Sequence, residues 1–526
     1  MGLSSEILAL FEPTSPHRTT ALSTTFLLGS AVVYLALFHP YQQKVKVPFV
    51  GVRNTSFLSL FLGGFKFVIN ARTIINEGYQ KYGDRPFQIS TYSGNRLVLS
   101  PKHVEELRNS PDSKLSFSAA SVEFLKADLV GMSDIIGQDH PPHTKTVRRE
   151  LTRDLAKFID PIVDETRFAF SQELPEAADW TPVALNSAVL RIVARISGRV
   201  FVGDSLCRNE EWLNTSVKFT EDLFTNAVVS TMVPGFMRSF LAAWVFPYAS
   251  RVARHRKIAH KYLAPIYAKL LAQQASGSEE PKEDVFSWML GHASTKPELR
   301  TAEKMADFQL VLSMAAIHTT TVTVVTVMYD LAARPEYIEG LREEMITMIE
   351  EDGGVLKKST LAKMVKLDSF MKESARINCS YLSFMRKVIV PMTLADGTHM
   401  PTGTMVAAPV RAMYDDPELL ENPEVFDGYR WSKLRQKENQ QNSHQFVSTS
   451  SSSLLFGHGN HACPGRFFAA NEIQIMLVSI LLRYDFKYQE GETRPGNWNL
   501  AEMVMQDKNK LLLFKKRANP PKFAFL

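Results

Sequence analysis

A single cysteine in a loop punctuated by glycines constrains this chain more than any other feature of its sequence. Residues 456–466 read FGHGNHACPGR, and a helical pattern follows directly. Gly459 and Gly465 can adopt tight backbone angles that let N–H groups point at the sulfur without Cβ clashes. Such N–H groups stabilise a buried thiolate that is bound to iron. The loop therefore favours Cys463 as the axial ligand of a haem.

Two other readings of Cys463 need to be weighed. The residue could be a buried structural thiol, or it could bind zinc together with His458 and His461. Zinc sites usually show paired spacing of the C-x-x-C or H-x-x-x-H type, whereas the other two cysteines, Cys207 and Cys379, are remote and unpaired in the sequence. The spacing therefore favours haem over zinc.

The composition fits one large globular domain. The chain has 526 residues, of which 45% are apolar and 22% charged, so it can bury a sizeable core. Three cysteines argue against a disulfide framework and for a reducing compartment. The 60 basic and 55 acidic residues give a net charge of only +5, which is too small to indicate nucleic-acid binding. A local basic face that docks an acidic protein partner is compatible with this charge.

An uncharged apolar run near the N-terminus, residues 21–38, is about long enough to span a bilayer. Lys44, Lys46 and Arg53 follow it, and by the positive-inside tendency they place the large C-terminal part in the cytosol. We therefore expect a lumenal segment at 1–20, a single transmembrane anchor at 21–38, a short linker at 39–51 and one catalytic domain at 52–526.

The patterns within that domain predict a mainly α fold with a small β portion. Short strands are indicated at 86–90 and 96–99, and a long helix at 301–333 that stops before Arg334-Pro335. No later stretch is long and polar enough to separate two domains.

The cysteine loop resembles the haem-binding signature of the cytochrome P450 family, in the form common among filamentous fungi. Phe456, Gly459, Cys463 and Gly465 match its F-x-x-G-x-x-x-C-x-G pattern. The resemblance extends from about Lys46 to the C-terminus. It implies the cytochrome P450 fold and one haem b, with Phe456 beside the ring and Cys463 as the proximal thiolate.

The long helix resembles the oxygen-binding helix of this family. Ala315, Ala316 and Thr319 match a pattern in which small residues make room for dioxygen and a threonine delivers protons to it. His318 stands where the family usually has an acid, so either His318 and Thr319 pass protons together or His318 only packs beside a neighbouring helix. Residues 310–329 lack Asp, Glu, Lys and Arg, which also suits a transmembrane helix, but His318 and the threonines favour a buried central helix.

A second motif lies downstream, where Glu373 and Arg376 are three residues apart and can meet on one side of a helix. In isolation the pair is a surface salt bridge. It resembles the family's E-x-x-R motif, and Arg430 stands where the family has the second arginine that brackets the glutamate.

The two haem propionates require cations or other donors. By position in the family, the candidates are Arg148, Arg386 and His461, with His143 as a local alternative to Arg148. Thr144 stands where the family usually has the tryptophan of this helix. Each candidate, taken alone, reads as a solvated surface residue.

The substrate is less constrained. By analogy of position, substrate contacts come from residues 116–135, Ala315 and residues 382–384. The apolar segment 232–247 is either core or a surface that dips into the bilayer at the substrate entrance.

The resemblance implies a monooxygenase at the endoplasmic reticulum membrane that inserts one oxygen atom of O2 into a lipophilic substrate. Electrons come from NADPH through a separate cytochrome P450 reductase, because the chain has no flavin or dinucleotide domain. Fungal relatives of this kind suggest a terpenoid, meroterpenoid or polyketide-derived intermediate. The alternatives are a P450-type isomerase or dehydratase without net oxygenation, and a non-catalytic membrane haem-binding protein.

Overall fold

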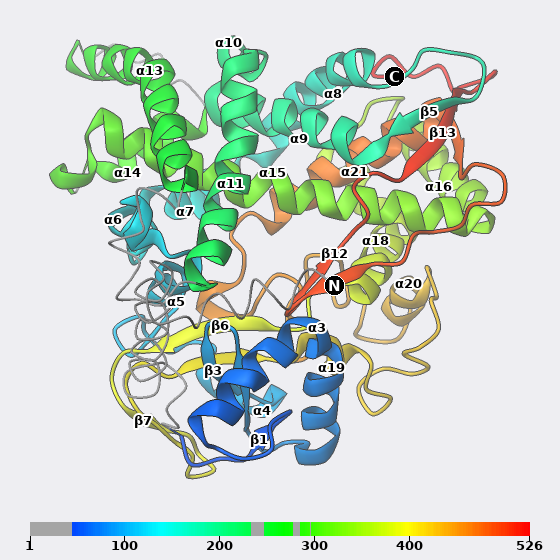
Figure 1. Cartoon of the computed structure of the whole chain (residues 1–526). Helices are drawn as coiled ribbons and strands as arrows, with labels where there is room; N and C mark the ends of the chain where they lie inside the picture. The colour runs from blue at the N-terminus through cyan, green and yellow to red at the C-terminus, as the bar shows by residue number, and fades with distance from the viewer. Residues whose placement is uncertain (1–44, 233–246, 277–283, 295) are drawn as a thin grey trace, which may run out of the picture.

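A computed structural model describes residues 45–232, 247–276, 284–294 and 296–526 of the chain. Helices form the larger layer, with the long helix α15 crossing its middle, and the main sheet lies below them in the view of Figure 1. The mainly α fold with a small β portion is thereby confirmed. The α-helices are α3 (Phe57–Tyr82), α4 (Pro101–Leu107), α5 (Phe117–Leu125), α6 (Ser133–Ile136), α7 (Pro142–Thr146), α8 (Ile159–Glu173), α9 (Leu185–Val202), α10 (Asp204–Cys207), α11 (Glu210–Met232), α13 (Pro247–Ala275), α14 (Val285–Ala293), α15 (Ala302–Ala333), α16 (Ile338–Glu351), α17 (Lys358–Lys363), α18 (Val365–Asn378), α19 (Val410–Tyr414), α20 (Arg430–Arg435) and α21 (Arg466–Arg483).

Shorter helical turns connect these elements. They are η1 (Ala127–Val130), η2 (Val147–Leu151), η3 (Leu155–Phe158), η4 (Pro297–Leu299), η5 (Pro335–Tyr337) and η6 (Gly459–His461). The last of them, η6, lies directly before Cys463, so the cysteine enters a short turn between two helical segments.

The main sheet has the strand order β1-β2-β3-β9-β6-β4, with parallel pairing for β1/β2 and β3/β9 and antiparallel pairing elsewhere. Three smaller sheets pair β10-β13-β5, β11-β12 and β7-β8. The predicted strands at 86–90 and 96–99 correspond to β2 and β3. The strands are β1 (Phe49–Val50), β2 (Phe87–Thr91), β3 (Gly94–Val98), β4 (Leu115–Ser116), β5 (Thr181–Ala184), β6 (Ser383–Val388), β7 (Met392–Thr393), β8 (His399–Met400), β9 (Met405–Ala408), β10 (Tyr484–Lys487), β11 (Trp498–Leu500), β12 (Met503–Met505) and β13 (Leu511–Lys516).

The long helix α15 is the centre of the helical layer. It packs against α9, α11, α13, α18 and α21. The most apolar stretch of 18 residues in this helix is 61% buried inside the protein. By length and hydropathy alone it could cross a membrane, as could α3. Its burial inside the protein instead makes it a core helix, as its polar residues predicted.

The first described residues already belong to the folded domain. Val45 is buried in a core cluster with strand residues such as Leu97 and Val406, and β1, which lies inside the segment that the sequence suggested as linker, pairs with β2. The predicted lumenal segment 1–20, the anchor 21–38 and residues 233–246 of the apolar 232–247 segment lie outside the described residues.

Candidate active site

Two glycines of the cysteine loop adopt left-handed backbone angles, Gly457 with a φ of +67° and Gly459. Gly459 has a φ of +72°, and a Cβ at this position would lie 2.2 Å from the carbonyl oxygen of Arg108. Asn460 donates its backbone N–H to the same oxygen at 3.1 Å, and Cys463 donates its own to Phe456 at 2.7 Å. The loop therefore docks on the end of α4. Gly465 differs from expectation, since its φ of −86° is open to any residue.

The surroundings of Cys463 suit a thiolate that is bound to a cation. Burial raises the pKa of the Cys463 thiol, while backbone N–H groups of Gly465 and Arg466 and the Arg466 guanidinium act to lower it. The guanidinium also donates to the Cys463 carbonyl at 2.8 Å. These donors are the N–H groups that the sequence predicted for a ligating sulfur.

The zinc reading of this loop has no support in the geometry. His458 contacts Thr449 and Glu105, and His461 contacts Asp112, so both rings are engaged elsewhere. Across the described residues, no group of three or more His, Cys, Asp or Glu side chains is arranged to hold a metal ion.

The E-x-x-R motif forms a buried network rather than a surface salt bridge. Glu373 and Arg376 on α18 are both fully buried and pair through Arg376 Nη2 and Glu373 Oε1 at 2.8 Å. Arg430 on α20 donates its Nε to the same oxygen at 3.1 Å, and Trp431 donates its indole N–H to Oε2 at 3.1 Å. The second arginine is therefore where the motif order predicted, and Trp431 is an additional donor.

Arg386 on β6 is a buried cation that forms no ion pair within the described residues. It is 4% exposed, and its Nη1 donates only to the neighbouring Met385 carbonyl at 2.8 Å. Its guanidinium lies over the rings of Phe117 at 5.1 Å and Phe384 at 4.6 Å. Burial lowers the pKa of Arg386 to about 10. Since a buried cation is costly without an anionic partner, the side chain fits an acidic group of a ligand.

The other predicted haem-binding residues lie around the same loop. Arg148, in η2, is exposed and donates to the Asn460 carbonyl at 2.8 Å, which ties it to the cysteine loop. His143 instead packs its ring 5.6 Å from Phe308 on α15 and leaves a buried Nδ1 without a hydrogen-bond partner. Burial lowers the pKa of His143 to about 4, so it is uncharged at neutral pH and is no substitute for the Arg148 cation.

Two residues near the cysteine loop were not singled out by sequence analysis. Asp112, between α4 and β4, places its Oδ1 2.7 Å from Nε2 of His461. Phe117 lies at the start of α5, and the Arg386 guanidinium lies over its ring. The centroids of the Phe117 and His461 rings are 5.8 Å apart. Ser110-Pro111-Asp112 signals a turn, which gives no indication of a partner. Phe117 does fall inside the range 116–135 that was predicted to contact substrate.

One face of the otherwise buried helix α15 is open in its middle. Ala315, Thr319 and Val322, at the i, i+4 and i+7 positions, are exposed, with Val322 at 44%. Ala315 and Thr319 are also two of the residues that matched the oxygen-binding pattern. In α15 they therefore lie on the face that other protein side chains leave exposed.

The polar pair on α15 points in two directions. Thr319 donates its hydroxyl to the Ala315 carbonyl at 2.7 Å, in the usual back-bonding of a helical threonine. His318 is mostly buried and its Nε2 lies 3.0 Å from the Val217 carbonyl on α11. Burial lowers the pKa of His318, although the Val217 carbonyl opposes the shift. The neutral ring therefore carries its hydrogen on Nε2.

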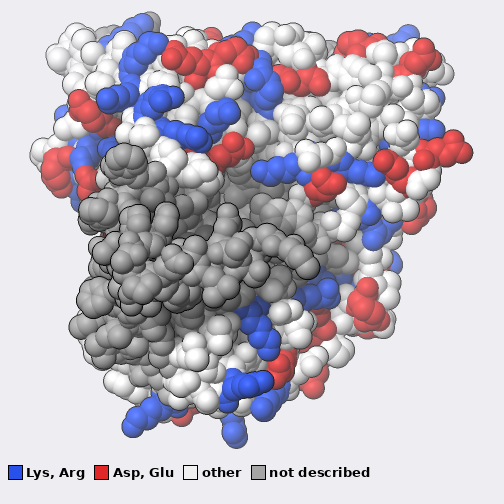
Figure 2. Space-filling model, viewed as in Figure 1, with Lys and Arg blue, Asp and Glu red and all other residues white. Residues whose placement is uncertain are grey.

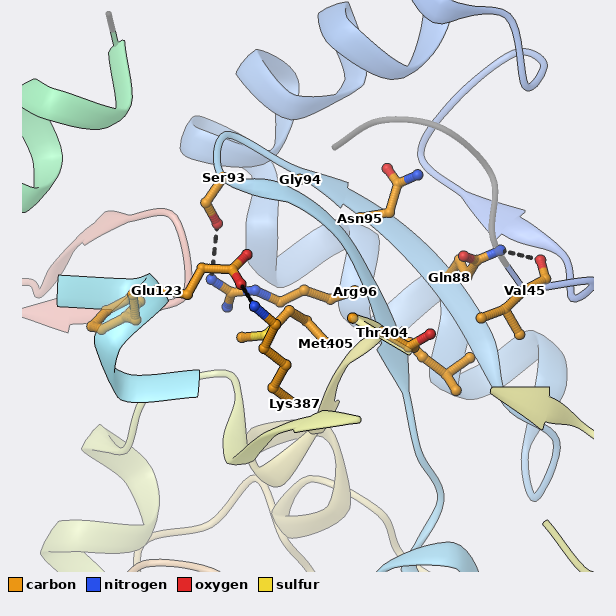
Figure 3. Close-up of a pocket in the computed structure, with 13 residues that line it drawn as sticks. Val45, Gln88, Ser93, Gly94, Asn95, Arg96, Glu123, Lys387, Thr404 and Met405 are labelled. Atoms are coloured by element: carbon orange, nitrogen blue, oxygen red, sulfur yellow. Dashed lines mark hydrogen bonds and ion pairs between the residues drawn. The ribbon is translucent and has the colours of Figure 1, made fainter. Parts of the chain in front are cut away.

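A separate cavity of about 150 Å³ lies between the main sheet and α5. Figure 3 shows Arg96 reaching Ser93 and Lys387 paired to Glu123 at 2.6 Å, with apolar residues such as Val45 and Met405 also in the lining. None of the predicted catalytic or haem-binding residues lines it. The cavity is therefore distinct from the site built around Cys463.

Comparison with known proteins agrees with this geometry. The family model described as Cytochrome P450 matches residues 61–514. Cytochrome P450 monooxygenase AN1598 of Emericella nidulans is 38% identical over 515 residues, covering 97% of this chain and 95% of the relative. Cytochrome P450 monooxygenase olcJ of Penicillium canescens is 37% identical over 523 residues, covering 97% of each.

Two further matches extend the comparison. An ent-kaurene oxidase of Gibberella intermedia is 34% identical over 482 residues, covering 90% of this chain and 89% of the relative. The solved structure titled "Retinoic acid bound cyanobacterial CYP120A1" superposes with a TM-score of 0.66 over 90% of this chain and 100% of its own, at 17% identity, which shows the shared fold. The chain belongs to the cytochrome P450 family and is a fungal cytochrome P450 monooxygenase.

Proposed function

We propose that the protein is a haem b monooxygenase that uses Cys463 as the proximal thiolate and acts on a lipophilic intermediate of fungal secondary metabolism. The observation that carries this proposal is the buried guanidinium of Arg386, which has no ion-pair partner among the described residues and lies beside Phe117 and the cysteine loop. An acidic group of a bound cofactor would supply the anion that this cation lacks.

Different residues around the loop would contact different parts of the haem. Cys463 supplies the axial sulfur, and the N–H groups of Gly465 and Arg466 stabilise its negative charge. Arg386, Arg148 and His461 supply donors for the propionates. Phe456, whose ring meets Phe446 edge-on at 5.1 Å, fixes the start of the loop and would contact the haem.

When bound, the haem supplies the reductive activation of O2 from which one oxygen atom is inserted into the substrate, favoured by the electron-rich thiolate. The open face of α15 then places Thr319 Oγ1 to hold a proton and pass it on. Rotation of the hydroxyl away from the Ala315 carbonyl directs its hydrogen into that uncovered space.

His318 is the proposed proton donor to Thr319. Its Nε2 is committed to the Val217 carbonyl, so Nδ1 is the nitrogen that can accept a proton from water and return it toward Thr319. In the competing interpretation the imidazole only fastens α11 to α15, and water reaches Thr319 by another route.

Coupling between NADPH use and product formation separates these roles. Thr319→Ala should keep haem and substrate binding but divert several times more NADPH into peroxide or water, because the proton is no longer delivered in place. If the relay operates, His318→Leu shows the same defect. The measurement is the product formed per NADPH consumed. If this ratio is that of the wild type in His318→Leu but is lowered in Thr319→Ala, the histidine has only a packing role.

The electron donor is proposed to be a separate NADPH:cytochrome P450 reductase. Arg148 and Arg149 are both exposed in η2, next to the cysteine loop, where they offer two cations to an acidic partner protein. On the face in Figure 2, basic and acidic side chains are intermixed.

We also propose that the protein is held at the endoplasmic reticulum membrane by residues 21–38, with the catalytic domain in the cytosol. The first half of α3 supports a membrane contact. It exposes an apolar stripe at helical spacing: Leu58 at 62%, Leu62 at 56%, Phe65 at 57% and Ile69 at 77%. Residues 39–44, which reach at most about 20 Å, join the apolar run to Val45, so α3 lies within reach of the bilayer.

A kink at Asn70 ends this apolar face. Beyond it the outward residues of α3 are polar: Arg72, Thr73, Glu77, Gln80 and Lys81. The same helix therefore offers an apolar half for lipid and a polar half for water.

Removal of residues 1–40 should release only part of the protein from membranes while keeping the haem spectrum. In that truncated protein, Leu62→Asp with Phe65→Asp should weaken vesicle binding about a hundredfold or more, because two apolar side chains of about 1.5 to 3 kcal/mol each are lost to the bilayer. Flotation with phospholipid vesicles measures this. Thr73→Asp with Gln80→Asp is the matched control on the polar half, and equal binding of both double variants would exclude α3 as the contact.

The proposed substrate class is a terpenoid, meroterpenoid or polyketide-derived scaffold. The ent-kaurene oxidases among the relatives are named for a terpenoid, which supports this choice. Expression with a reductase in yeast, feeding of candidate intermediates and mass spectrometry of the products test it. A product heavier by one oxygen supports oxygenation, a product of unchanged mass or lighter by water supports the isomerase or dehydratase alternative, and no turnover with any candidate supports a passive haem protein.

A further inference from the structure

His318 lies where α11 packs across α15 (Figure 1). Its Nε2 lies 3.0 Å from the carbonyl oxygen of Val217 on α11. In an α-helix, the carbonyl oxygen of one residue faces the backbone N–H of the residue four positions later. For Val217 that later residue is Glu221, whose side chain is exposed. The imidazole therefore lies beside an acid that is in contact with water.

A cation approaches the same imidazole from the segment that follows β12. Gln506 donates its Nε2 to the Val322 carbonyl, one helical turn beyond the histidine, at 2.9 Å. The carbonyl of Asp507 accepts a hydrogen bond from the Tyr329 hydroxyl at 3.1 Å. These two contacts fasten the segment along α15, and they bring the exposed Lys508 to the other side of the histidine.

The two charges act on the imidazole in opposite directions. Burial lowers the pKa of His318, the Val217 carbonyl and Glu221 oppose that shift, and Lys508 adds to it. In the described part of the chain, Glu221 and Lys508 are the charged groups that act on this ring. Residues 310–329 of α15 itself carry no Asp, Glu, Lys or Arg. A ring that burial keeps neutral therefore depends on groups from other elements to become protonated.

We propose that Glu221 is a positioning residue for proton delivery, whose carboxylate favours the protonated form of His318 while Lys508 opposes it. The proton enters at Nδ1 from water, because Nε2 already donates to the Val217 carbonyl. The ring is then a cation, and it becomes neutral again when Nδ1 passes this proton toward Thr319. One proton is taken up and one is released, so the ring ends as it began. The inference rests on the proposed relay.

The first measurement is the protonation of His318 itself, followed by NMR of isotope-labelled histidine rings in the full-length, haem-loaded protein. The carbon monoxide complex of the reduced protein keeps the haem diamagnetic, and loss of the signal in His318→Leu assigns it. A unit charge roughly 10 Å away, at an effective dielectric constant of about 40, changes a protonation equilibrium about fourfold. Glu221→Gln should lower the affinity of the ring for its proton by about this factor, and Lys508→Met should raise it.

Glu211→Gln and Lys218→Met are the matched controls. Both residues are exposed on α11, but Glu211 pairs with Lys261 at 2.7 Å near the start of the helix, and neither acts on the His318 ring. Their replacement should leave the protonation equilibrium unchanged. Glu221→Asp keeps the negative charge and should stay near wild type.

The second measurement is the product formed per NADPH consumed, as a function of pH. In the wild type this ratio should fall as the pH rises through the range in which His318 loses its proton. The fall should come at lower pH in Glu221→Gln and at higher pH in Lys508→Met. Loss of packing would not move two variants in opposite directions, so the sign of each shift separates a charge effect from a structural one.

An unchanged protonation equilibrium in Glu221→Gln would overturn the inference, as would shifts of the same sign in Glu221→Gln and Lys508→Met. A shifted equilibrium with an unchanged pH profile of coupling would also overturn it when His318→Leu is uncoupled. Failure of the relay has a different signature: His318→Leu then couples like the wild type, whatever Glu221→Gln does.

Discussion

Replacing Cys463 with alanine should abolish the absorption band that carbon monoxide produces with reduced thiolate-ligated haem. In the proposed site the sulfur is the axial ligand, and the backbone N–H groups of Gly465 and Arg466 are hydrogen-bond donors to it. The expected loss is complete, not partial, because an alanine methyl group cannot coordinate iron. Difference spectroscopy of the dithionite-reduced protein with and without carbon monoxide measures it.

Cys379→Ala is the matched control. Cys379 is also free, but it lies at the end of α18 with its Sγ directed at the Arg376 carbonyl at 3.2 Å. Its replacement should leave the band in place. An unchanged band in Cys463→Ala would reject the assignment of the axial ligand.

The second large effect concerns the buried network of Glu373. Glu373→Ala removes the carboxylate that two buried guanidinium groups, Arg376 and Arg430, and the indole N–H of Trp431 share, and leaves the arginines with backbone carbonyls as acceptors. Breaking a buried ion pair in this way costs about 3 to 5 kcal/mol. A typical domain has only about 5 to 15 kcal/mol of net stability, so we expect little folded, haem-loaded protein.

The measurement is the yield of haem-loaded protein, with the unfolding midpoint of whatever material is recovered. Glu424→Gln provides the control, because Glu424 is an exposed acid in the segment just before Arg430. It should behave as wild type, since an exposed charge contributes at most about 1 kcal/mol. A Glu373→Ala protein as stable as Glu424→Gln would show that the network does not hold the segment beneath the haem.

Several parts of the site could be predicted from the sequence because they are local. The cysteine loop needs particular residues within ten positions, and Gly459 indeed takes the positive φ that its place demands. Glu373 and Arg376 are one helical turn apart, so their pairing follows from helix geometry. The oxygen-binding pattern was recognisable for the same reason, since Ala315 and Thr319 lie on one face of a helix.

Other parts could not be predicted. The contact between Asp112 and His461 joins residues from distant parts of the chain, and no spacing rule connects them. The tie from His318 to Val217 likewise depends on how α11 lies on α15. Gly465 was expected to need unusual backbone angles, but the turn into α21 uses ordinary ones.

The sequence by itself was enough to predict the family and the mainly α architecture and to single out the cysteine loop, because motif residues and helical periodicity lie close together in the chain. Only the tertiary structure decided which polar groups are buried and which face each other. Within the part of the chain that the structure describes, it made Arg386 a buried cation without an ion pair, placed Asp112 against His461, and left apolar side chains of the first half of α3 exposed. Burial and long-range pairing depend on packing between elements far apart in the chain, and packing sets the dielectric surroundings that give each of these charges its effect.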